Sequence, residues 1–405
     1  MEDVLEGFLT LDNLDVSGKT VLFRADINSV IIDGKVQMKE RIVENAKTIR
    51  ELSENKAKVV ILAHQGRAGG KEFLPLEQHA QLLSKFVDLT YIDEIIGSTA
   101  REAIKKLAPS AVLLLENVRM LAEETLDKTP EEHSRSFFVQ RLASLADIYI
   151  NDAFSVAHRA HASIVGFPTV LDAGVGRLME SELIALERAV HQIERPCVYL
   201  LGGVKPEEVF DIIDFVLDSG NVDYILTTGS VGNLFMCANG MIPMKVAKHC
   251  LENVSRAKSI QEKAGNKIKY PYDLAIDVAG KREEITVDQV KMNQQLYDIG
   301  RETIEKYSEI IKNARTVIMK GPAGFYEKEG FAVGTRELFK AILASDAFSI
   351  LGGGHTSAAI SDLGINTAKM NHIHVSLAGG AFLRYLVGKP LPGVEVLKVK
   401  KKVKK

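Results

Sequence analysis

Short runs of apolar residues alternate with longer amphipathic stretches along the whole chain. The runs are rich in Val, Ile and Leu, which is typical of parallel strands that are buried on both faces of a sheet. Between them, segments such as 41–55 and 301–314 place apolar residues at helical spacing. The alternation predicts an α/β fold with parallel sheets covered by helices. The predicted strands are Thr20–Phe23, Lys58–Ala63, Ala111–Leu115, Asp147–Ile150, Cys197–Leu201, Tyr224–Thr227, Leu274–Ile276, Thr316–Met319, Phe348–Leu351 and His372–Val375.

One amphipathic segment, residues 174–196, lies between the two halves of this pattern and ends at a proline. We interpret it as a helix that joins two Rossmann-like domains, and a surface helix within one domain is the alternative. The length of 405 residues supports two domains at roughly 100–200 residues each. We therefore predict domains at 1–175 and 196–390, a joining helix at 176–195 and a C-terminal segment at 391–405.

Charge and composition limit the possible partners. The 51 Lys and Arg residues nearly balance the 53 Asp and Glu residues, so no large field favours nucleic acid or an anionic membrane. Six lysines fall within residues 398–405, and a solvated tail is favoured there over a polyanion-binding arm. No apolar stretch has the length of a membrane span, and the N-terminal residues lack a signal-peptide pattern, so we expect a cytoplasmic protein. Cys197, Cys237 and Cys250 show no CxxC spacing, which argues against a disulfide framework or a zinc site.

The residues that follow the predicted strands of the first half are charged or polar. Ligands of open α/β sheets bind beyond the carboxyl ends of the strands, so these positions are candidates for a site. Guanidinium and imidazole groups gathered at one edge suit a small anion with several oxygens, and we predict a phosphorylated acid. A single arginine there is more often a surface or ion-paired residue than a ligand, but repetition at several strand ends favours a binding site; the histidines could be structural. The positions are Arg24, Asp26, Asn28, His64, Arg67, Glu116, Asn117, Arg119, Asn151, Asp152, His158, Arg159 and His161.

The predicted strands of the second half are followed by glycines instead. Glycine lets the backbone approach a ligand, and amides there can bind phosphate, although tight turns also use glycine. In GGVKPEE, Lys205 precedes a proline at a helix start, and GPAGFYE ends in Glu327, a carboxylate that could bind ribose hydroxyls. We predict a nucleotide site without a P-loop or a dinucleotide fingerprint, because neither motif occurs. The glycines are Gly202, Gly203, Gly229, Gly280, Gly321, Gly324, Gly352, Gly353, Gly354, Gly379 and Gly380.

Ten motifs in order resemble the phosphoglycerate kinase family. They are VLFRADIN, RI at Arg41, HQGR, LLLENVR, NDAFSVAHRAH, GRLMESEL, GGVK, GPAGFYE, GGGHT and LPGVEVL, and they extend from Val21 to Leu397. One such match alone would mean little, whereas ten in sequence are specific. GGGHT and the short C-terminal region are similar to the archaeal branch.

The resemblance implies reversible phosphoryl transfer between ATP and the carboxylate of 3-phosphoglycerate, which yields 1,3-bisphosphoglycerate and ADP in glycolysis and gluconeogenesis. It implies Mg²⁺, a monomer without nucleic-acid or membrane partners, and two domains that close a cleft by hinge motion. By this resemblance the acid-binding residues are Arg24, Asp26, Asn28, Arg41, His64, Arg67, Arg119, Arg159 and His161. The nucleotide-binding residues are Gly203, Lys205, Gly229, Gly321, Pro322, Glu327, Gly353, Gly354, His355 and Thr356. Arg41 and Lys205 are expected to neutralise charge on the transferring group, as catalytic residues.

The chain departs from the family pattern at three positions. Val209 stands where many members have a second lysine, and Lys320 replaces the asparagine of the NGP motif; we hypothesise that Lys320 supplies the missing charge, with a solvent-facing lysine as the alternative. His355 stands where most members have an aspartate near the metal, so no metal ligand is assigned.

Two other functions are alternatives to the one that this resemblance implies. Another two-lobed kinase or ligase is opposed by the complete arginine set of the first half. A non-catalytic nucleotide-binding protein is opposed by the presence of both half-sites.

Overall fold

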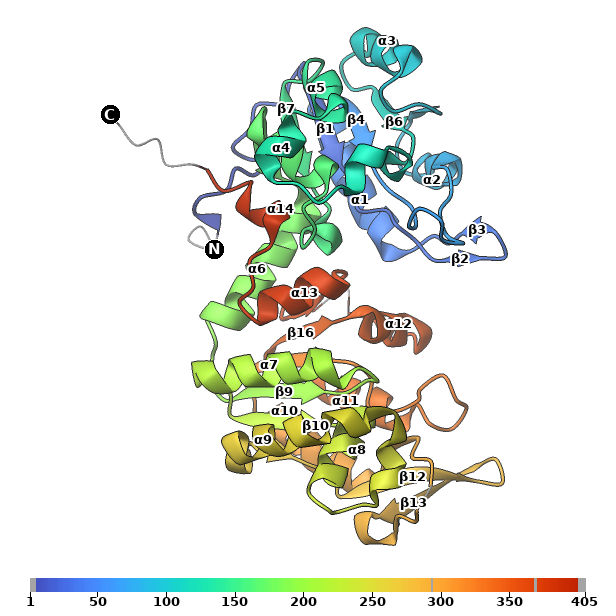
Figure 1. Cartoon of the computed structure of the whole chain (residues 1–405), viewed down its shortest axis with the longest axis vertical. Coiled ribbons are helices and arrows are strands. Elements are labelled where there is room, and N and C mark those ends of the chain that lie inside the picture. The colour runs from blue at the N-terminus through green and yellow to red at the C-terminus, as the bar shows by residue number, and fades with distance from the viewer. Residues whose placement is uncertain (1–4, 293, 368–369, 400–405) are drawn as a thin grey trace. The chain divides into compact units, whose positions relative to one another are not determined.

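The computed structural model describes residues 5–292, 294–367 and 370–399, and of residues 247–251 only the backbone. Two compact units make up the chain: one holds the residues up to Ile184 together with those from Pro390 onward, and the other holds Ala185–Lys389 (Figure 1). The side chain of Cys250 and five of the six lysines in the predicted tail lie outside this description. Within the described residues, no helix has both the length and the apolar composition needed to cross a bilayer.

The described part of the first unit contains a six-stranded parallel sheet in the order β5-β6-β4-β1-β7-β8. Its strands are β1 (Thr20–Arg24), β4 (Lys58–Leu62), β5 (Thr90–Ile92), β6 (Val112–Leu115), β7 (Ile148–Asn151) and β8 (Asp172–Val175). A hairpin joins β2 (Ile31–Ile32) and β3 (Lys35–Val36). The helices are α1 (Glu40–Glu54), α2 (Glu77–Leu83), α3 (Ser98–Lys106), α4 (Pro130–Ser134), α5 (Phe137–Ala143) and α14 (Pro392–Glu395). The four strands predicted for this half are therefore confirmed.

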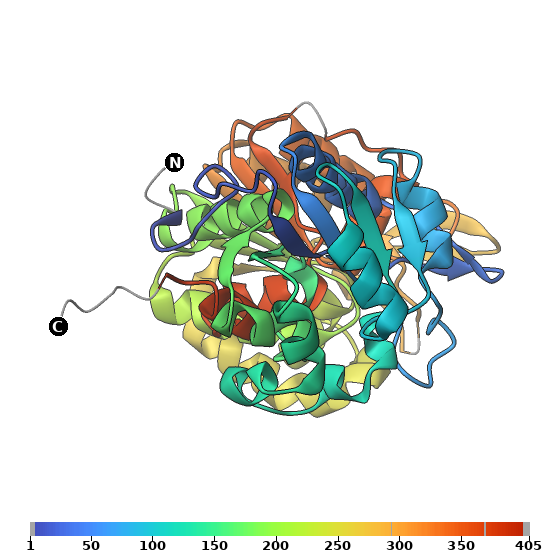
Figure 2. The same ribbon diagram turned by 90° about the horizontal axis from the view of Figure 1, so that it is seen from above.

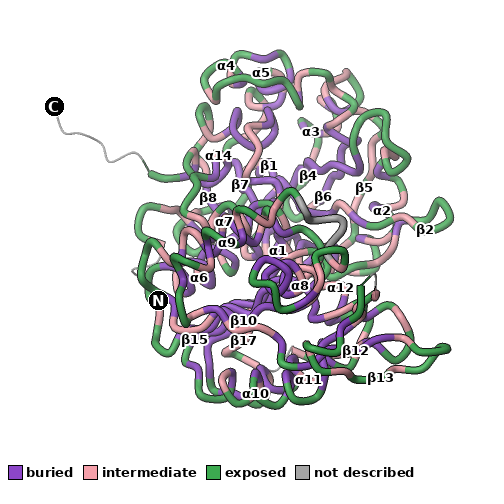
Figure 3. Tube along the Cα trace, turned by 60° about the horizontal axis from the view of Figure 1, so that its bottom comes forward, coloured by how far each residue is buried: buried purple, intermediate pink, exposed green. Residues whose placement is uncertain are grey.

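Both faces of this sheet are buried, and Figure 3 colours the central strands as buried along most of their length. Successive side chains of a strand point to opposite faces. On one face Phe23 belongs to the same apolar cluster as Ile49 of α1. On the other, the ring of Tyr149 stacks on Phe167 at a centroid distance of 5.6 Å, and Phe167 meets Phe138 of α5 edge-on. Helical packing on both faces explains why the strands are apolar runs rather than alternating sequences.

The second unit contains another six-stranded parallel sheet, in the order β11-β10-β9-β15-β16-β17 among the described residues. Its strands are β9 (Cys197–Leu201), β10 (Tyr224–Thr227), β11 (Ile268–Lys269), β15 (Thr316–Lys320), β16 (Phe348–Gly352) and β17 (Ile373–Val375). Its helices include α7 (Pro206–Ser219), α8 (Gly229–Ala238), α9 (Val254–Ala264), α10 (Arg301–Lys312), α11 (Val333–Leu343), α12 (Gly354–Asp362) and α13 (Gly379–Leu386). Two parallel α/β sheets confirm the predicted fold class.

One predicted strand was assigned to the wrong kind of sheet. Residues 274–276 lie in β12 (Asp273–Val278), which pairs antiparallel with β13 (Lys281–Thr286) and β14 (Asp298–Ile299) in a separate sheet. Gly280 therefore occupies a hairpin turn, with φ of +82°, and does not follow a parallel strand. β13 is charged and largely exposed, so it contains no apolar run from which the pairing could be predicted.

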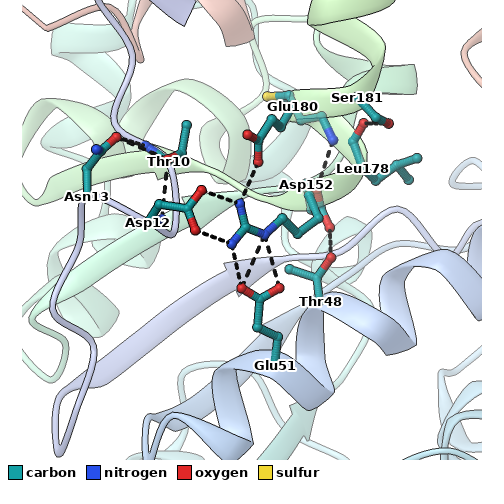
Figure 4. Close-up of polar contacts among 11 residues, drawn as sticks. Thr10, Asp12, Asn13, Thr48, Glu51, Asp152, Leu178, Glu180 and Ser181 are labelled. Atoms are coloured by element: carbon teal, nitrogen blue, oxygen red, sulfur yellow. Dashed lines mark hydrogen bonds and ion pairs between the residues drawn. The ribbon is translucent and has the colours of Figure 1, made fainter. Parts of the chain in front are cut away.

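Helix α6 (Arg177–His191) occupies the predicted joining segment, and its first turn is anchored within the first unit (Figure 4). The Arg177 guanidinium bonds to carboxylates of Asp12, Glu51 and Glu180, at 2.6 to 2.9 Å for the shortest contact with each. Asp152, at the end of β7, accepts a hydrogen bond from the Met179 amide at 2.9 Å and so satisfies a free N–H of the helix start.

The segment after Pro390 packs on the loops that follow β7 (Figure 2). The amide of Gly393 donates to Ala157 O at 2.8 Å, and Val396 packs on the cluster that contains Val156 and Ile164. Lys398, the first lysine of the predicted tail, contacts Glu395 at 2.8 Å. The segment thus completes the first unit although it follows the second in sequence.

Candidate active site

The parallel sheet of the first unit brings four of the predicted strand ends together. β6, β4, β1 and β7 are neighbours in that order, and the carboxyl ends of parallel strands share one edge. The acid-binding residues predicted on the loops that follow these strands therefore start from one edge, and Arg41 lies in the first turn of α1.

Arg24 is fully buried and supports the site from beneath. Its Nε donates to Ser163 Oγ at 2.7 Å, and its Nη2 lies 3.1 Å from His64 Nδ1. Because a guanidinium can only donate, Nδ1 of His64 accepts and the ring proton is on Nε2. Burial, followed by the charges of Arg24 and Arg119, holds the pKa of His64 well below 6.5, so the imidazole is neutral.

Glu124 is the buried carboxylate that balances this cationic cluster. It accepts hydrogen bonds from Ser163 N and Oγ at 2.8 and 2.7 Å, and its Oε1 lies 3.6 Å from His161 Nδ1 and 4.0 Å from Arg24. Burial alone would raise the pKa of Glu124, but His161, Arg24 and Ser163 outweigh it and the net pKa is lowered. Sequence reasoning missed Glu124 because it follows no strand directly.

Arg119 is fixed by the loop that follows β4. Its Nη1 donates to the carbonyl of Gly66, and its amide donates to Asn117 Oδ1 at 3.1 Å. Gly66 has φ of +68°, and a Cβ there would lie 2.2 Å from Glu72 O, so only glycine fits. Burial lowers the pKa of Arg119 to about 10, with added repulsion from Arg24 and Arg159.

Two guanidinium groups of the cluster keep buried donors that have no partner among the described residues. These are Nε of Arg119 and Nε of Arg159. Arg67 is exposed, and its charge contributes to the lowered pKa of Arg159 after the larger effect of burial. A buried N–H without an acceptor is costly, and like charges held together repel. An anion with several oxygens would accept from these N–H groups and would neutralise the repelling positive charges.

Three further predicted residues of the first unit, Arg41, Asp26 and Asn28, make polar contacts of their own. Arg41 Nη1 lies 3.7 Å from Asp26 Oδ1, and a quarter of the Arg41 side chain is exposed. Asn28 Oδ1 accepts from the amide of Gly66 at 2.8 Å, which links the β1 loop to the loop that holds Arg119. Asp26 and Asn28 therefore act on the shape of the site as well as its charge.

The second unit contains a pocket of about 360 Å³. Five of the predicted nucleotide-binding residues line it: Gly203, Gly229, Pro322, Glu327 and His355. The other wall was not predicted. It includes Asn233, Leu296, Tyr297, Asp298 and Phe325.

The glycine loops meet closely beside this pocket. Gly203 and Gly321 have φ of +86° and +81°, and a Cβ on Gly321 would lie 2.5 Å from the Gly202 carbonyl. The Gly321 amide donates to Oγ1 of buried Thr356 at 2.8 Å. Thr356 and Gly321 thus hold the loops, whereas Gly353 and Gly354 begin α12 without lining the pocket. The close approach requires residues without side chains.

Aromatic rings and a buried carboxylate shape the unpredicted wall. The rings of Tyr297 and Phe325 are nearly parallel at a centroid distance of 6.3 Å. Asp298 accepts from Arg282 Nη1 and from the Gly334 amide, both at 2.8 Å. Burial raises the pKa of Asp298 to about 6, against the opposing effects of Gly334 and Arg282. These residues lie in the antiparallel sheet and in the loop after β15. The sequence around them has no motif of charged or polar residues, so this wall of the pocket was not predicted.

The predicted lysines lie near the start of α7. Lys205 is exposed and its Nζ lies 3.3 Å from Glu208. Lys320, at the end of β15, is 7% exposed and contacts the same carboxylate, so it is not the solvent-facing lysine that was the alternative. Among the described residues, no group of three or more His, Cys, Asp or Glu side chains could hold a metal ion.

Comparisons with known proteins agree with this picture. A family model described as phosphoglycerate kinase matches residues 11–389. A phosphoglycerate kinase from Methanothermus fervidus is 42% identical over 405 aligned residues that cover 98% of each chain. Solved structures of phosphoglycerate kinases from Pyrococcus horikoshii (39% identity, TM-score 0.88) and Coxiella burnetii (34%, TM-score 0.81) each cover 96% of this chain, and it covers 98% of each of them. The expected resemblance to archaeal members is confirmed.

Proposed function

The chain belongs to the phosphoglycerate kinase family, and from that premise we propose how its two units share the reaction. The enzyme transfers the γ-phosphoryl group of ATP reversibly to the carboxylate of 3-phosphoglycerate. In our proposal the first unit binds the acid and the second binds the nucleotide. The unpartnered Nε donors of Arg119 and Arg159 carry this assignment.

The acid site divides into residues that contact substrate and residues that support them. Arg41, Arg67, Arg119, Arg159 and His161 are proposed to bind the phosphate and carboxylate groups, since bidentate guanidinium contacts recognise both. Neutral His64 can donate from Nε2 to a substrate oxygen. Arg24 is too deeply buried to serve as more than a support, with Asp26 and Asn28 shaping the edge.

The chemistry needs no general base. The carboxylate of the acid is already ionised at neutral pH, so its oxygen attacks the γ-phosphorus directly. The bond to the β–γ bridging oxygen breaks, and ADP leaves with that electron pair, so no proton is transferred. The protein then contributes positioning, exclusion of water and neutralisation of the transferring charge. We assign this neutralisation to Arg41 and Lys205.

The nucleotide is proposed to lie in the pocket of the second unit. Tyr297 and Phe325 offer an apolar wall for the base, and Glu327 lies where it could accept from ribose hydroxyls. The glycine loops at Gly203 and Gly321 suit the phosphates because no side chain covers their backbone. The described residues contain no carboxylate cluster for a metal, so Mg²⁺ would be held mainly by the nucleotide phosphates and would neutralise their charge there.

A coupled assay tests this function. The protein is mixed with Mg-ATP and 3-phosphoglycerate, and product formation is followed as NADH oxidation through glyceraldehyde-3-phosphate dehydrogenase. We expect turnover with 3-phosphoglycerate and none with 2-phosphoglycerate or glycerate. Binding of both substrates without turnover would contradict the proposal and favour a non-catalytic role. The monomeric state, the cytoplasmic location and the hinge closure remain predictions.

A further inference from the structure

Glu208 lies between two lysines that come from different elements of the second unit. It is in the first turn of α7, and its Oε1 is 3.3 Å from Lys205 Nζ while its Oε2 is 3.0 Å from Lys320 Nζ. One carboxylate therefore serves two cations. The group of three keeps a net positive charge.

The two lysines differ sharply in exposure. The Lys205 side chain is 64% exposed, whereas that of Lys320 is only 9% exposed. Burial lowers the pKa of Lys320 from its usual 10.5, and the neighbouring Glu208 opposes that effect. A buried ammonium group needs hydrogen-bond acceptors for its three N–H donors. Among the described residues, Lys320 has only one oxygen of the Glu208 carboxylate, whose other oxygen pairs with Lys205, and that is too few acceptors. Lys320 therefore has capacity for a further anion.

The backbone around Lys320 is held in place by the glycine loops. Its carbonyl accepts from the Gly202 amide at 2.8 Å, and its side-chain stem lies beside Gly353, 3.9 Å from where a Cβ would be. Gly203 and Pro322, next to these contacts, line the pocket. The ammonium group is thus fixed at the same loops that the proposed function assigns to the phosphates.

We propose that Lys320 is a second phosphate-binding lysine and that Glu208 is a positioning residue, a resident carboxylate that holds both lysines until nucleotide phosphates take its place. The proposal rests on the proposed function, because it requires a nucleotide polyphosphate in this pocket. Phosphate oxygens and a carboxylate compete for the same ammonium groups. Lys205 is free to turn toward the phosphates, whereas Lys320 keeps its position and Glu208 loses its contacts.

Competition gives Glu208 and Lys320 opposite effects on binding. Replacing Glu208 by Gln removes the competitor, and we expect about three- to fivefold tighter ADP binding at low salt. The gain should shrink as salt is raised. Replacing Lys320 by Met removes a charged donor at similar volume, and we expect about ten- to hundredfold weaker ADP binding. Adenosine, which lacks phosphates, should bind all variants equally.

Isothermal titration of ADP and adenosine into the wild-type chain and the Glu208→Gln, Lys320→Met and double variants tests the proposal. The double variant is decisive. If Lys320 binds phosphate, the double variant stays weaker than wild type and binds ADP at most about three- to fivefold more tightly than Lys320→Met, because only Lys205 is released. If the pair is only structural, removing both charges restores wild-type affinity. The double variant also removes the Glu208 charge that Lys320→Met leaves without its buried partner. The test therefore stays valid even if Lys320→Met alone folds poorly. Lys340→Met and Glu337→Gln, an exposed ion pair on α11, serve as matched controls.

The outcomes separate this inference from the proposed function. Wild-type protein that binds ADP and turns over 3-phosphoglycerate, with Lys320→Met equal to it, would overturn this inference alone. So would a Glu208→Gln variant that loses as much ADP affinity as Lys320→Met. Failure of the wild-type chain to bind ADP would overturn the proposed function and this inference together. The KM for 3-phosphoglycerate should not change in any variant.

Discussion

Arg24 and Arg159 carry the same guanidinium group but have different surroundings. Arg24 is enclosed by Ser163, His64 and Glu124, with no exposed surface. Arg159 is partly exposed, and within the part of the chain that the structure describes its Nε has no partner. One of these arginines therefore belongs to the folded core and the other is available to a substrate.

Replacing Arg24 by alanine should lower stability, whereas replacing Arg159 by alanine should weaken substrate binding. Arg24→Ala leaves the buried Glu124 charge without its cation, and we expect a loss of about 3–5 kcal/mol in the free energy of unfolding. Arg159→Ala should change that free energy by less than about 0.5 kcal/mol, while the KM for 3-phosphoglycerate rises at least about tenfold. Urea unfolding and steady-state kinetics measure the two effects, and the reverse pattern would refute the division.

Arg41 and Lys205 are expected to act on turnover itself. Removing one preorganised donor to the transferring phosphoryl group should lower kcat by about 100- to 1,000-fold, and Arg41→Ala and Lys205→Ala test this. Lys47→Ala is a control on α1, since Lys47 is exposed and pairs with Glu44. Unchanged turnover in either variant would remove that residue from the catalytic role.

Asp152 provides a prediction about pH. Burial raises the pKa of Asp152 from 3.8 to about 6, against hydrogen bonds from Met179 and Thr48. The native chain then holds this proton more tightly than the unfolded chain. The resulting stability is present at pH 4 and is lost as the pH rises through about 6. Asp152→Asn should reduce that loss, because an amide is neutral throughout. Its Oδ1 can still accept from the Met179 amide, and its Nδ2 can donate to Thr48 Oγ1 in place of the bond that Asp152 accepts from that hydroxyl.

Unfolding in urea from pH 4 to 8 measures this effect. The pKa of Asp298 is also raised to about 6, so part of the pH dependence of the unfolding free energy should persist in the Asp152→Asn variant. Asp346→Asn, at an exposed position, serves as the control and should retain the wild-type profile. If Asp152→Asn shows the same pH dependence of stability as the wild type, Asp152 does not contribute to that dependence.

Positions directly after apolar runs could be predicted from the sequence, because parallel strands bring them to one edge. Glu124 and Asp298 could not. Each is buried by contacts from segments distant in sequence, Ser163 for one and Gly334 for the other. The residues next to Glu124 and Asp298 in the sequence do not indicate that these two carboxylates are buried.

At the scale of elements, strands were predictable where both faces are covered. β4 and β15 are apolar runs for this reason, whereas the strands of the two parallel sheets that were not predicted, β5, β8 and β11, lie at sheet edges. The run at 274–276 was recognised as a strand, but its direction depends on β13, whose residues are mostly charged. An apolar run shows that a strand is buried and does not show which neighbour it pairs with.

Helix α14 provides a prediction at this scale. A Cβ on Gly393 would lie 2.5 Å from Ile164 Cγ2 and 3.0 Å from Ala157 Cα. Gly393→Ala should displace α14 or the loop between Ala157 and Ile164, which carries Arg159 and His161. We expect a loss of about 1–3 kcal/mol in the free energy of unfolding and a higher KM for 3-phosphoglycerate.

The same variant should leave ADP affinity unchanged, because the pocket lies in the other unit. Gly379→Ala is the matched control, since a Cβ there meets nothing within 4 Å. Thermal unfolding, kinetics and ADP titration distinguish the outcomes. If Gly393→Ala weakens ADP binding as much as acid binding, the effect is a general loss of folding.

At the scale of the whole molecule, a net charge of −2 conceals a concentrated cationic site. The arginines and histidines of the first unit are gathered by one sheet, and the glycine loops of the second by another. Each unit has its own apolar core. The two proposed binding functions therefore depend on separately packed structures.

Hydrogen exchange should resolve this separation. We expect 3-phosphoglycerate to slow exchange mainly in the loops after β1, β4, β6 and β7. ADP should slow it mainly around Gly203, Gly321 and the start of α12. Mass spectrometry of peptides from each unit reads out both effects. Equal protection of both units by either ligand alone would contradict the assignment of one ligand to each unit.

The return of residues 390–399 to the first unit has a consequence for synthesis on the ribosome. The second unit spans residues 185–389, and at roughly 5–20 residues per second its translation takes roughly 10–40 s. Throughout that interval the nascent first unit has all its arginines but lacks α14 beneath the loop of Arg159 and His161. The second unit is fully translated before the first can close its core, so the unit that is made first is the last to be finished.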